Sequence, residues 1–237
     1  MRAALQDAVY DGFIESNPLF EWTWRNREIA NDKQKLDPFT KLEMEQILSY
    51  AEGQNRNFIA FWLWTGMRPS ELIALDWSDI NLTLGAITIN KAITDASEAP
   101  EPTKTNSSTR VLKLLPPALD ALKMQREFTY LKQKEVFQNP KTRSRWTGAQ
   151  QIRRTMWIPL MEKAGVRYRY PYQLRHTFAS MMYSSREHRG WLSKYLGHAD
   201  ETVTLKTYAK WLSEADENAG MKAVTIFAND SINDSVK

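Results

Sequence analysis

One short β region interrupts a chain whose other segments mostly have the apolar spacing of helices. Within residues 80–114, the segments AITI (86–89) and TRVLKLL (109–115) alternate apolar and polar side chains, and two prolines end the second segment. Windows on either side carry apolar residues three and four apart, which is the helical period. This pattern predicts an α+β fold, mainly α with a small antiparallel β-sheet.

Breaking residues locate one helix start that matters for chemistry. The helix over residues 55–66 ends at Gly66, and Pro69 marks the start of the next one. Arg68 is therefore expected at a helix N-terminus, where backbone N–H groups favour an anion. Glu71, one turn further on, could orient this arginine. Taken alone, the pair would be an ordinary surface ion pair.

Basic residues are concentrated in one block of the sequence. Residues 137–186 contain ten Lys or Arg and one acid, which gives this block a charge of +9, although the chain's net charge is only +4. Aromatic side chains lie among them, and this combination favours a nucleic-acid partner over the simpler explanation of a solvated basic face. The candidates for phosphate contacts are Arg143, Arg145, Arg153 and Arg154.

Composition and spacing exclude several other classes. The chain has no cysteine, which excludes a disulfide scaffold and fits a reducing compartment. No apolar run could span a bilayer and the first residues lack a secretory pattern, so we expect a cytoplasmic protein without membrane contact. The acids Glu71, Asp76 and Asp79 lack the spacing of a two-metal site, and the histidines form no HExxH motif, which disfavours a metal-dependent nuclease.

Chemistry-bearing residues are densest between residues 170 and 211. This stretch contains the motifs YQLRH (172–176), LGH (196–198) and TLKTYAKW (204–211). Arg175 has the side chain best shaped to bind a phosphate, through two parallel hydrogen bonds. Tyr208 is a weak nucleophile at neutral pH and needs neighbours that take its proton and stabilise developing charge. His176 is expected to point elsewhere and to pack against apolar side chains.

Together with TGMRPSEL (65–72) and TKTNSSTR (103–110), these motifs resemble the tyrosine recombinases, the phage-integrase family, in order and spacing. The resemblance implies the catalytic domain of that family, which acts on double-stranded DNA at attachment sites without a metal or a cofactor. One position departs from the pattern, because Tyr172 stands where the family has histidine. A phenol accepts protons less readily than an imidazole, so a reduced or differently shared acid–base role is expected there.

The resemblance also implies a role for each matching residue. Tyr208 would attack a backbone phosphate, forming a 3′-phosphotyrosyl link and leaving a free 5′-hydroxyl. Arg68 and Arg175 would hold the non-bridging oxygens, with Glu71 supporting Arg68. His198 would hydrogen-bond the same phosphate.

A lysine between the two predicted strands completes the implied site. Lys104 would protonate the leaving oxygen as a general acid. Lys113 is the alternative candidate for this role. Tyr172 would hydrogen-bond the phosphate. With these residues the implied reaction is recombination, because a second DNA hydroxyl can attack the phosphotyrosine.

The resemblance predicts three parts of the chain. Residues 1–36 would be a residual helix and linker from an absent N-terminal core-binding domain, residues 37–211 the catalytic domain, and residues 212–237 a C-terminal tail. We expect a homotetramer on DNA, whereas the free chain could be a monomer. Two alternatives remain open: a DNA-binding protein or decayed integrase without chemistry, and a nicking–closing enzyme like a type IB topoisomerase.

Overall fold

The computed structural model describes residues 2–20, 36–93, 97, 99–103, 108–131, 134–198 and 200–208. It divides the chain into two compact units, Met1–Lys35 and Leu36–Lys237. The first unit contains one described helix, α1 (Arg2–Tyr10). Most of the predicted linker and the whole predicted tail lie outside the described residues, so the proposed division into three parts stays a prediction. No described helix is both long and apolar enough to cross a bilayer.

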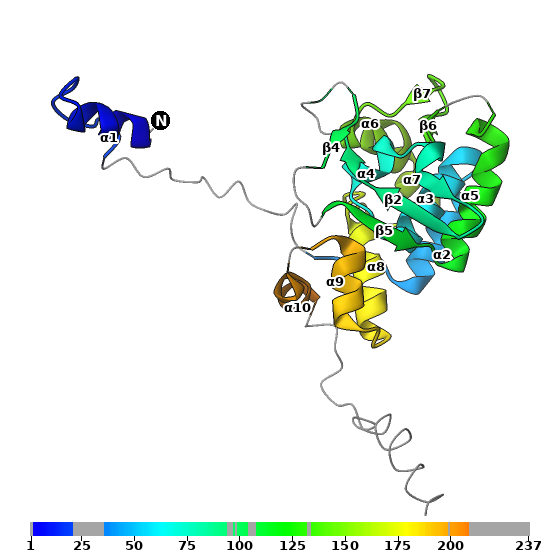
Figure 1. Ribbon diagram of the computed structural model, residues 1–237. Coiled ribbons are helices and arrows are strands. Elements are labelled where there is room, and N and C mark those ends of the chain that lie inside the picture. Colours follow the sequence, from blue (N-terminus) through cyan, green and yellow to red (C-terminus); the bar gives the residue numbers. More distant parts are fainter. Residues whose placement is uncertain are drawn as a thin grey trace, which may run out of the picture. The chain divides into compact units, whose positions relative to one another are not determined.

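The second unit is mainly helical (Figure 1). Its described helices are α2 (Lys41–Tyr50), α3 (Gly53–Thr65), α4 (Pro69–Ala74), α5 (Pro116–Thr129), α6 (Ala149–Ile152), α7 (Ile158–Ala164), α8 (Gln173–Ser184), α9 (Arg189–Leu196) and α10 (Glu201–Tyr208). A π-helical turn, Arg153–Trp157, joins α6 to α7 just before Pro159. Because proline cannot donate a backbone N–H, it disturbs the regular hydrogen bonding of a helix.

The predicted β region forms a three-stranded antiparallel sheet. Its strands are β1 (Ile80–Asn81), β2 (Ala86–Ile89) and β5 (Arg110–Lys113), in the order β1-β2-β5. Two hairpins add β3 (Lys91–Ala92) with β4 (Glu101–Pro102), and β6 (Gln138–Asn139) with β7 (Ser144–Arg145). On the central pair, Ile87 lies opposite Leu112 and both are buried. The predicted mainly α fold with a small antiparallel sheet is therefore confirmed.

Helix α3 lies at the centre of the core and packs against α5 and α8. Three aromatic residues of this helix, Phe58, Phe61 and Trp62, are buried, and Trp64 is partly buried. Phe58 meets the rings of Trp62 and Phe137 edge to face, with centroids 5.7 and 5.1 Å apart. Such arrangements are favourable for aromatic rings beyond the area that they bury.

The end of α3 brings two distant segments together. Gly66 ends the helix in the left-handed conformation, with φ +58°, and a Cβ atom there would lie only 2.5 Å from the ring of Phe178 on α8. Only glycine fits this approach without a shift of the backbone or the ring. The loop that carries Arg68 is therefore held directly beside the helix that carries Arg175.

The last three described helices form one group. Helix α10 packs against both α8 and α9, and α9 also contacts strand β5. Figure 1 shows α10 beside α9. The YQLRH, LGH and TLKTY segments lie on or beside these helices. They consequently meet one another and the α3–α4 loop in one region.

Candidate active site

Arg68 is the residue that caps the N-terminus of α4, as predicted. Its backbone N–H donates to Glu71 Oε2 at 3.0 Å, and its Nη1 donates to Glu71 Oε1 at 3.0 Å. Its Nη2 donates to the carbonyl oxygen of Gly197 at 3.0 Å. The side chain remains 32% exposed. Its guanidinium is thus fixed on two sides while part of it stays open to a ligand.

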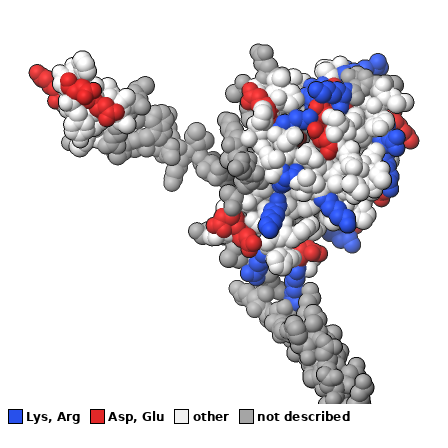
Figure 2. Space-filling view, viewed as in Figure 1, with Lys and Arg blue, Asp and Glu red and all other residues white. Residues whose placement is uncertain are grey.

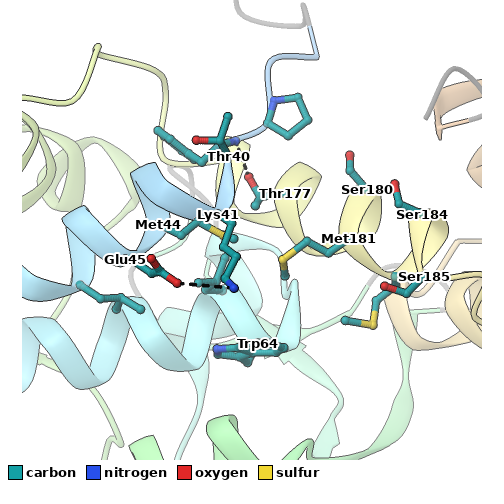
Figure 3. A pocket seen from close by; sticks show the side chains of 15 residues that line it. Thr40, Lys41, Met44, Glu45, Trp64, Thr177, Ser180, Met181, Ser184 and Ser185 are labelled. Atoms are coloured by element: carbon teal, nitrogen blue, oxygen red, sulfur yellow. Dashed lines mark hydrogen bonds and ion pairs between the residues drawn. The ribbon is translucent and has the colours of Figure 1, made fainter. Parts of the chain in front are cut away.

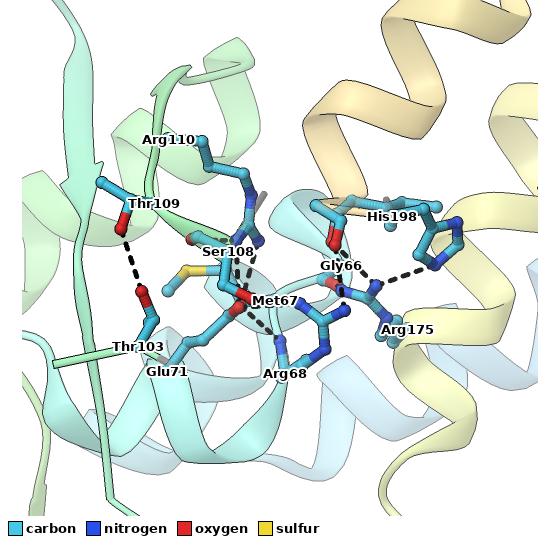
Figure 4. A network of polar contacts seen from close by, with 12 residues as sticks. Gly66, Met67, Arg68, Glu71, Thr103, Ser108, Thr109, Arg110, Arg175 and His198 are labelled. Atoms are coloured by element: carbon cyan, nitrogen blue, oxygen red, sulfur yellow. Dashed lines mark hydrogen bonds and ion pairs between the residues drawn. The ribbon is translucent and has the colours of Figure 1, made fainter. Parts of the chain in front are cut away.

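Glu71 is held by a second arginine, Arg110, that sequence reasoning did not single out (Figure 4). Arg110 donates to both Glu71 oxygens, at 2.9 and 3.0 Å, and its Nε donates to the carbonyl oxygen of Tyr195 at 2.9 Å. Burial acts to raise the pKa of Glu71, but the hydrogen bond and charge of Arg110, together with Arg175 and the Arg68 backbone, hold this pKa below its usual value. The only sequence signal for Arg110 was its place at the end of TKTNSSTR.

Arg175 lies in the first turn of α8 and is 1% exposed. Its Nη1 donates to the carbonyl oxygen of Gly66 at 2.7 Å, and its Nη2 donates to that of Leu196 at 2.8 Å. Burial is the main reason why its pKa lies below the usual value. Because its partners among the described residues are carbonyl oxygens and an imidazole, its charge is held in place without being neutralised.

His198 bonds to Arg175 in a way that defines its tautomer. The Nη2 of Arg175 lies 3.1 Å from His198 Nε2, and His198 Nδ1 lies 2.7 Å from the hydroxyl of Thr204. An arginine can only donate, so Nε2 is the acceptor and Nδ1 carries the proton of the neutral ring. Burial, and then the charges of Arg175 and Arg68, lower the pKa of His198 to about 4, which keeps the ring neutral at pH 7.

The prediction that His176 points away from the site is wrong. Its Nδ1 lies 2.7 Å from the hydroxyl oxygen of Tyr208, and the two ring centroids are 5.9 Å apart. Burial, followed by the charge of Arg175, lowers the pKa of His176 to about 4. The apolar neighbours in sequence suggested packing, whereas the actual partner lies 32 residues away on α10.

Tyr208 is 1% exposed, at the end of α10. Burial raises the pKa of its hydroxyl above the usual value, although the charge of Arg175 acts in the opposite direction. Tyr172 precedes α8 and is 38% exposed, with its ring centroid 5.0 Å from that of His176. Both tyrosines thus contact the same imidazole.

The carbonyl oxygens of two glycines connect distant segments of the site through hydrogen bonds. Gly66, two residues before Arg68, offers its carbonyl oxygen to Arg175, and Gly197, immediately before His198, offers its carbonyl oxygen to Arg68. Gly197 has φ +69°, and a Cβ atom there would lie 2.8 Å from Arg110. Each arginine is therefore positioned by the segment that precedes another member of the site.

The lysine candidates have different outcomes. Lys104 lies outside the described residues. Thr103, directly before it, is described, and its hydroxyl oxygen lies 2.9 Å from that of Thr109. Lys113 is exposed near the far end of β5 from Arg110. The role of general acid therefore stays a prediction for Lys104.

Much of the basic block is neutralised by acids from earlier in the chain. The ion pairs that do this are Arg145 with Asp76, Lys163 with Glu52, Arg167 with Asp37, and Arg169 with Asp37 and Glu43. Arg145 also donates to the carbonyl oxygen of Ile73 at 2.8 Å, so its guanidinium is occupied within the fold. Figure 2 accordingly shows basic side chains with acidic ones among them rather than one continuous basic patch.

Three of the four predicted phosphate contacts remain available. Arg143, in the β6–β7 turn, and Arg154, on the π-helical turn, are exposed. Arg153 is partly exposed and donates its Nε to the hydroxyl of Tyr168 at 2.7 Å, with its guanidinium 5.0 Å from the ring centroid of Tyr170. The side chain of Arg145 is 19% exposed and its charge stabilises buried Asp76, so its contact with DNA stays a prediction.

A separate pocket of about 710 Å³ lies between α2, α3 and α8 (Figure 3). Its walls include Met44, Trp64 and Met181, with Lys41 and Glu45 at 3.9 Å from each other at its edge. The predicted site residues do not line it. Within the described ranges, no three His, Asp or Glu side chains converge as ligands for a metal ion.

Comparison with known proteins gives consistent matches. A sequence model of the Phage integrase family matches residues 38–214. Prophage integrase IntR of Escherichia coli (strain K12) is 28% identical over 240 residues, which cover 90% of this chain and 56% of that protein. Putative defective protein IntQ of the same strain is 29% identical over 241 residues, with coverages of 90% and 58%. The chain thus spans little more than half the length of these relatives.

Solved structures share the fold at lower identity. The Tn1549 transposon integrase in complex with circular intermediate DNA has a TM-score of 0.71 at 19% identity, covering 95% of this chain and 76% of that one. A lambda integrase tetramer bound to a Holliday junction has a TM-score of 0.62 at 18% identity, with coverages of 91% and 58%. At these identities the likeness concerns the fold alone.

Proposed function

Because the chain belongs to the phage integrase family, we propose that it is a site-specific DNA recombinase that cleaves and rejoins strands through a 3′-phosphotyrosyl intermediate. The catalytic domain would comprise residues 37–211. The observation that carries the proposal is the convergence of two arginines, two histidines and a tyrosine, through hydrogen bonds that join residues up to 129 positions apart. Convergence of this kind is typical of a catalytic site.

The arginines would bind the scissile phosphate. Arg68 has an open side, and Arg175 carries a positive charge that only carbonyl and imidazole groups surround among its described partners. A phosphate oxygen entering here would meet two guanidinium groups and offset their mutual repulsion. Glu71 supports this role because it fixes Arg68 without reaching Arg175 by a described hydrogen bond.

The remaining roles are those that the resemblance to the family implies. Tyr208 would be the nucleophile, Lys104 the general acid for the leaving 5′ oxygen, and Tyr172 a hydrogen-bond donor to the phosphate. His198 would join this group once its bond to Arg175 is exchanged for one to the phosphate, because its Nε2 accepts in the present arrangement. A protonated ring would donate from that nitrogen.

Double-stranded DNA with attachment sites would be the substrate, contacted through Arg143, Arg153 and Arg154. The solved relatives support this proposal, because one is a complex with circular intermediate DNA and another is a tetramer on a Holliday junction. By the same reasoning this chain would act as a homotetramer on DNA, within the cytoplasm of a bacterium or a phage-infected cell.

A trapped covalent adduct tests the proposal. The protein would be incubated with nicked suicide duplexes taken from candidate attachment-site sequences, and the adduct would be identified by mass spectrometry. We expect a DNA 3′-phosphate linked to Tyr208, no adduct with Tyr208→Phe, and slower but measurable cleavage with Tyr172→Phe. An adduct on another residue, or none on any duplex that the protein binds specifically, would overturn the proposal.

A second candidate, a decayed integrase that binds DNA without chemistry, has two specific observations in its favour. A relative of similar identity is described as a putative defective protein, and Tyr172 departs from the family pattern in this chain. Specific binding to duplex without any covalent species would support this candidate. Relaxation of supercoiled plasmid without strand exchange would instead indicate an enzyme like a type IB topoisomerase.

A further inference from the structure

The imidazole nearest the proposed nucleophile is one that no motif role accounts for. His176 Nδ1 is 2.7 Å from the Tyr208 hydroxyl, which is hydrogen-bonding distance. His198, by contrast, uses both ring nitrogens on Arg175 and Thr204. The only described imidazole that contacts the nucleophilic oxygen is therefore His176.

We propose that His176 is the general base that takes the proton of Tyr208 during DNA cleavage. This role rests on the proposed recombinase function and adds a residue to it. His176 lies one helical turn after Tyr172, the position where the family has histidine, and the two rings are in contact at 5.0 Å. The imidazole that is absent at residue 172 is thus replaced by one a turn later, on the same side of the helix.

Placement on α8 keeps this base beside the phosphate. His176 directly follows Arg175, which would hold a non-bridging oxygen, so both groups belong to one rigid turn of helix. Tyr208 is 1% exposed, so DNA must displace part of what covers it before its oxygen meets a phosphate. An oxygen that attacks a phosphate bound to Arg175 nevertheless remains close to His176.

The step is balanced as follows. The O–H bond of Tyr208 breaks and its proton passes to His176 Nδ1, so the neutral ring must carry its own proton on Nε2. The Tyr208 oxygen forms a bond to phosphorus, the bond from phosphorus to the 5′ oxygen breaks, and that oxygen takes a proton from Lys104. In rejoining, the incoming hydroxyl returns a proton to Lys104 and His176 returns one to Tyr208.

The charges around His176 make its pKa depend on whether a phosphate is bound. Its pKa of about 4 is caused by burial and by the charge of Arg175, so the ring is neutral at pH 7 and free to accept. A phosphate anion bound at Arg175 would offset that charge and raise the pKa of His176. Among the described residues, the charged or titratable groups that face it are Arg175 on α8, Tyr172 just before α8, Tyr208 on α10 and His198 after α9.

The substitution His176→Asn tests the role. The asparagine amide can occupy the place of Nδ1 and bond to the Tyr208 hydroxyl, but it cannot become a conjugate acid at neutral pH. We expect normal DNA binding and a single-turnover cleavage rate lowered by about 100-fold or more, the usual contribution of a general base. The acidic limb of the pH–rate profile should disappear with it. His188→Asn is the matched control, because His188 is an exposed helix cap that asparagine can replace.

A sulfur leaving group separates the base from the acid. In a duplex with a bridging 5′ sulfur at the scissile bond, the thiolate leaves without protonation, because a thiol has a pKa of about 8.5. Lys104→Ala should then cleave at the wild-type rate, whereas His176→Asn should remain slow. Recovery of His176→Asn on this substrate would place His176 on the leaving group and overturn the proposal.

Two further outcomes would also overturn it. A rate for His176→Asn equal to that of the wild-type protein would show that Tyr208 needs no proton acceptor there. A faster rate would show that His176 restrains the nucleophile instead of activating it. Failure of the proposed function looks different, because the wild-type protein itself would then form no Tyr208 adduct.

Discussion

Loss of the Glu71 carboxylate should destabilise the protein far more than loss of an exposed one. Glu71 is 2% exposed and accepts two hydrogen bonds each from Arg68 and Arg110. In Glu71→Ala, Arg68 can rehydrate because its side chain is 32% exposed, but Arg110, at 8%, is left as a nearly buried charge. Breaking a buried pair from one side costs about 3–5 kcal/mol.

Urea unfolding followed by circular dichroism would measure this cost, which corresponds to a fall of about 10 °C in Tm for a chain of this size. Glu45→Ala is the control, because Glu45 is 62% exposed and pairs with Lys41 at 3.9 Å, so its loss should cost at most about 1 kcal/mol. Adding Arg110→Met to Glu71→Ala removes the stranded charge and should recover about 1 kcal/mol or more. A cost below about 1 kcal/mol for Glu71→Ala would refute the reasoning, since it would mean that water reaches Arg110.

Three other perturbations test separate parts of the structure. Gly197→Ala places a Cβ 2.8 Å from Arg110 at φ +69° and should lower Tm more than Gly165→Ala, where φ is +64° and the Cβ meets nothing within 4 Å. Arg154→Ala should weaken DNA binding and lower the slope of log K against log salt concentration by about 1, without loss of stability. Arg145→Ala should instead lower Tm and leave this slope unchanged. The reverse pattern would contradict the ion pair of Arg145 with Asp76. His176 and His198 have pKa values of about 4 in the fold against 6.5 for the free side chain, so the unfolded state binds more protons between these values. Stability, measured by urea unfolding, should therefore be fully present above pH 6.5 and fall towards pH 4, by about 1 kcal/mol for each histidine at pH 5 after allowance for partial exposure.

Sequence reasoning succeeded where the signal was local. The glycine that ends α3 and the proline that starts α4 place Arg68 at a helix N-terminus, and the structure has it there. Alternation in two short segments predicted the central strands, which pair in the sheet. Backbone preferences of single residues act over one or two turns, so they can be read without knowing the fold.

Partners that lie far along the chain could not be predicted from local sequence. His176 was expected to pack because its sequence neighbours are apolar, but its hydrogen bond goes to α10. The ion pair of Arg145 with Asp76, 69 residues earlier, was likewise not predicted from the basic block. A count of charges along a sequence cannot show which acids the fold will bring to them.

The hydrogen bonds of the two arginines to the carbonyl oxygens of Gly66 and Gly197 also determine when the site can form during folding. The contact from Arg175 to Gly66 joins residues 109 apart, and that from Arg68 to Gly197 joins residues 129 apart. Contacts of such long sequence separation form late, because closing a large loop costs entropy before any contact rewards it. During synthesis, α3 and α4 are made long before α8 and the LGH segment. Arg68 can therefore form its bond to Gly197 only after the LGH segment has been made. A partly made chain without the LGH segment would therefore lack both the partner of Arg68 and the α9 part of the core, and the proposed DNA cleavage would be confined to molecules whose synthesis has passed α10.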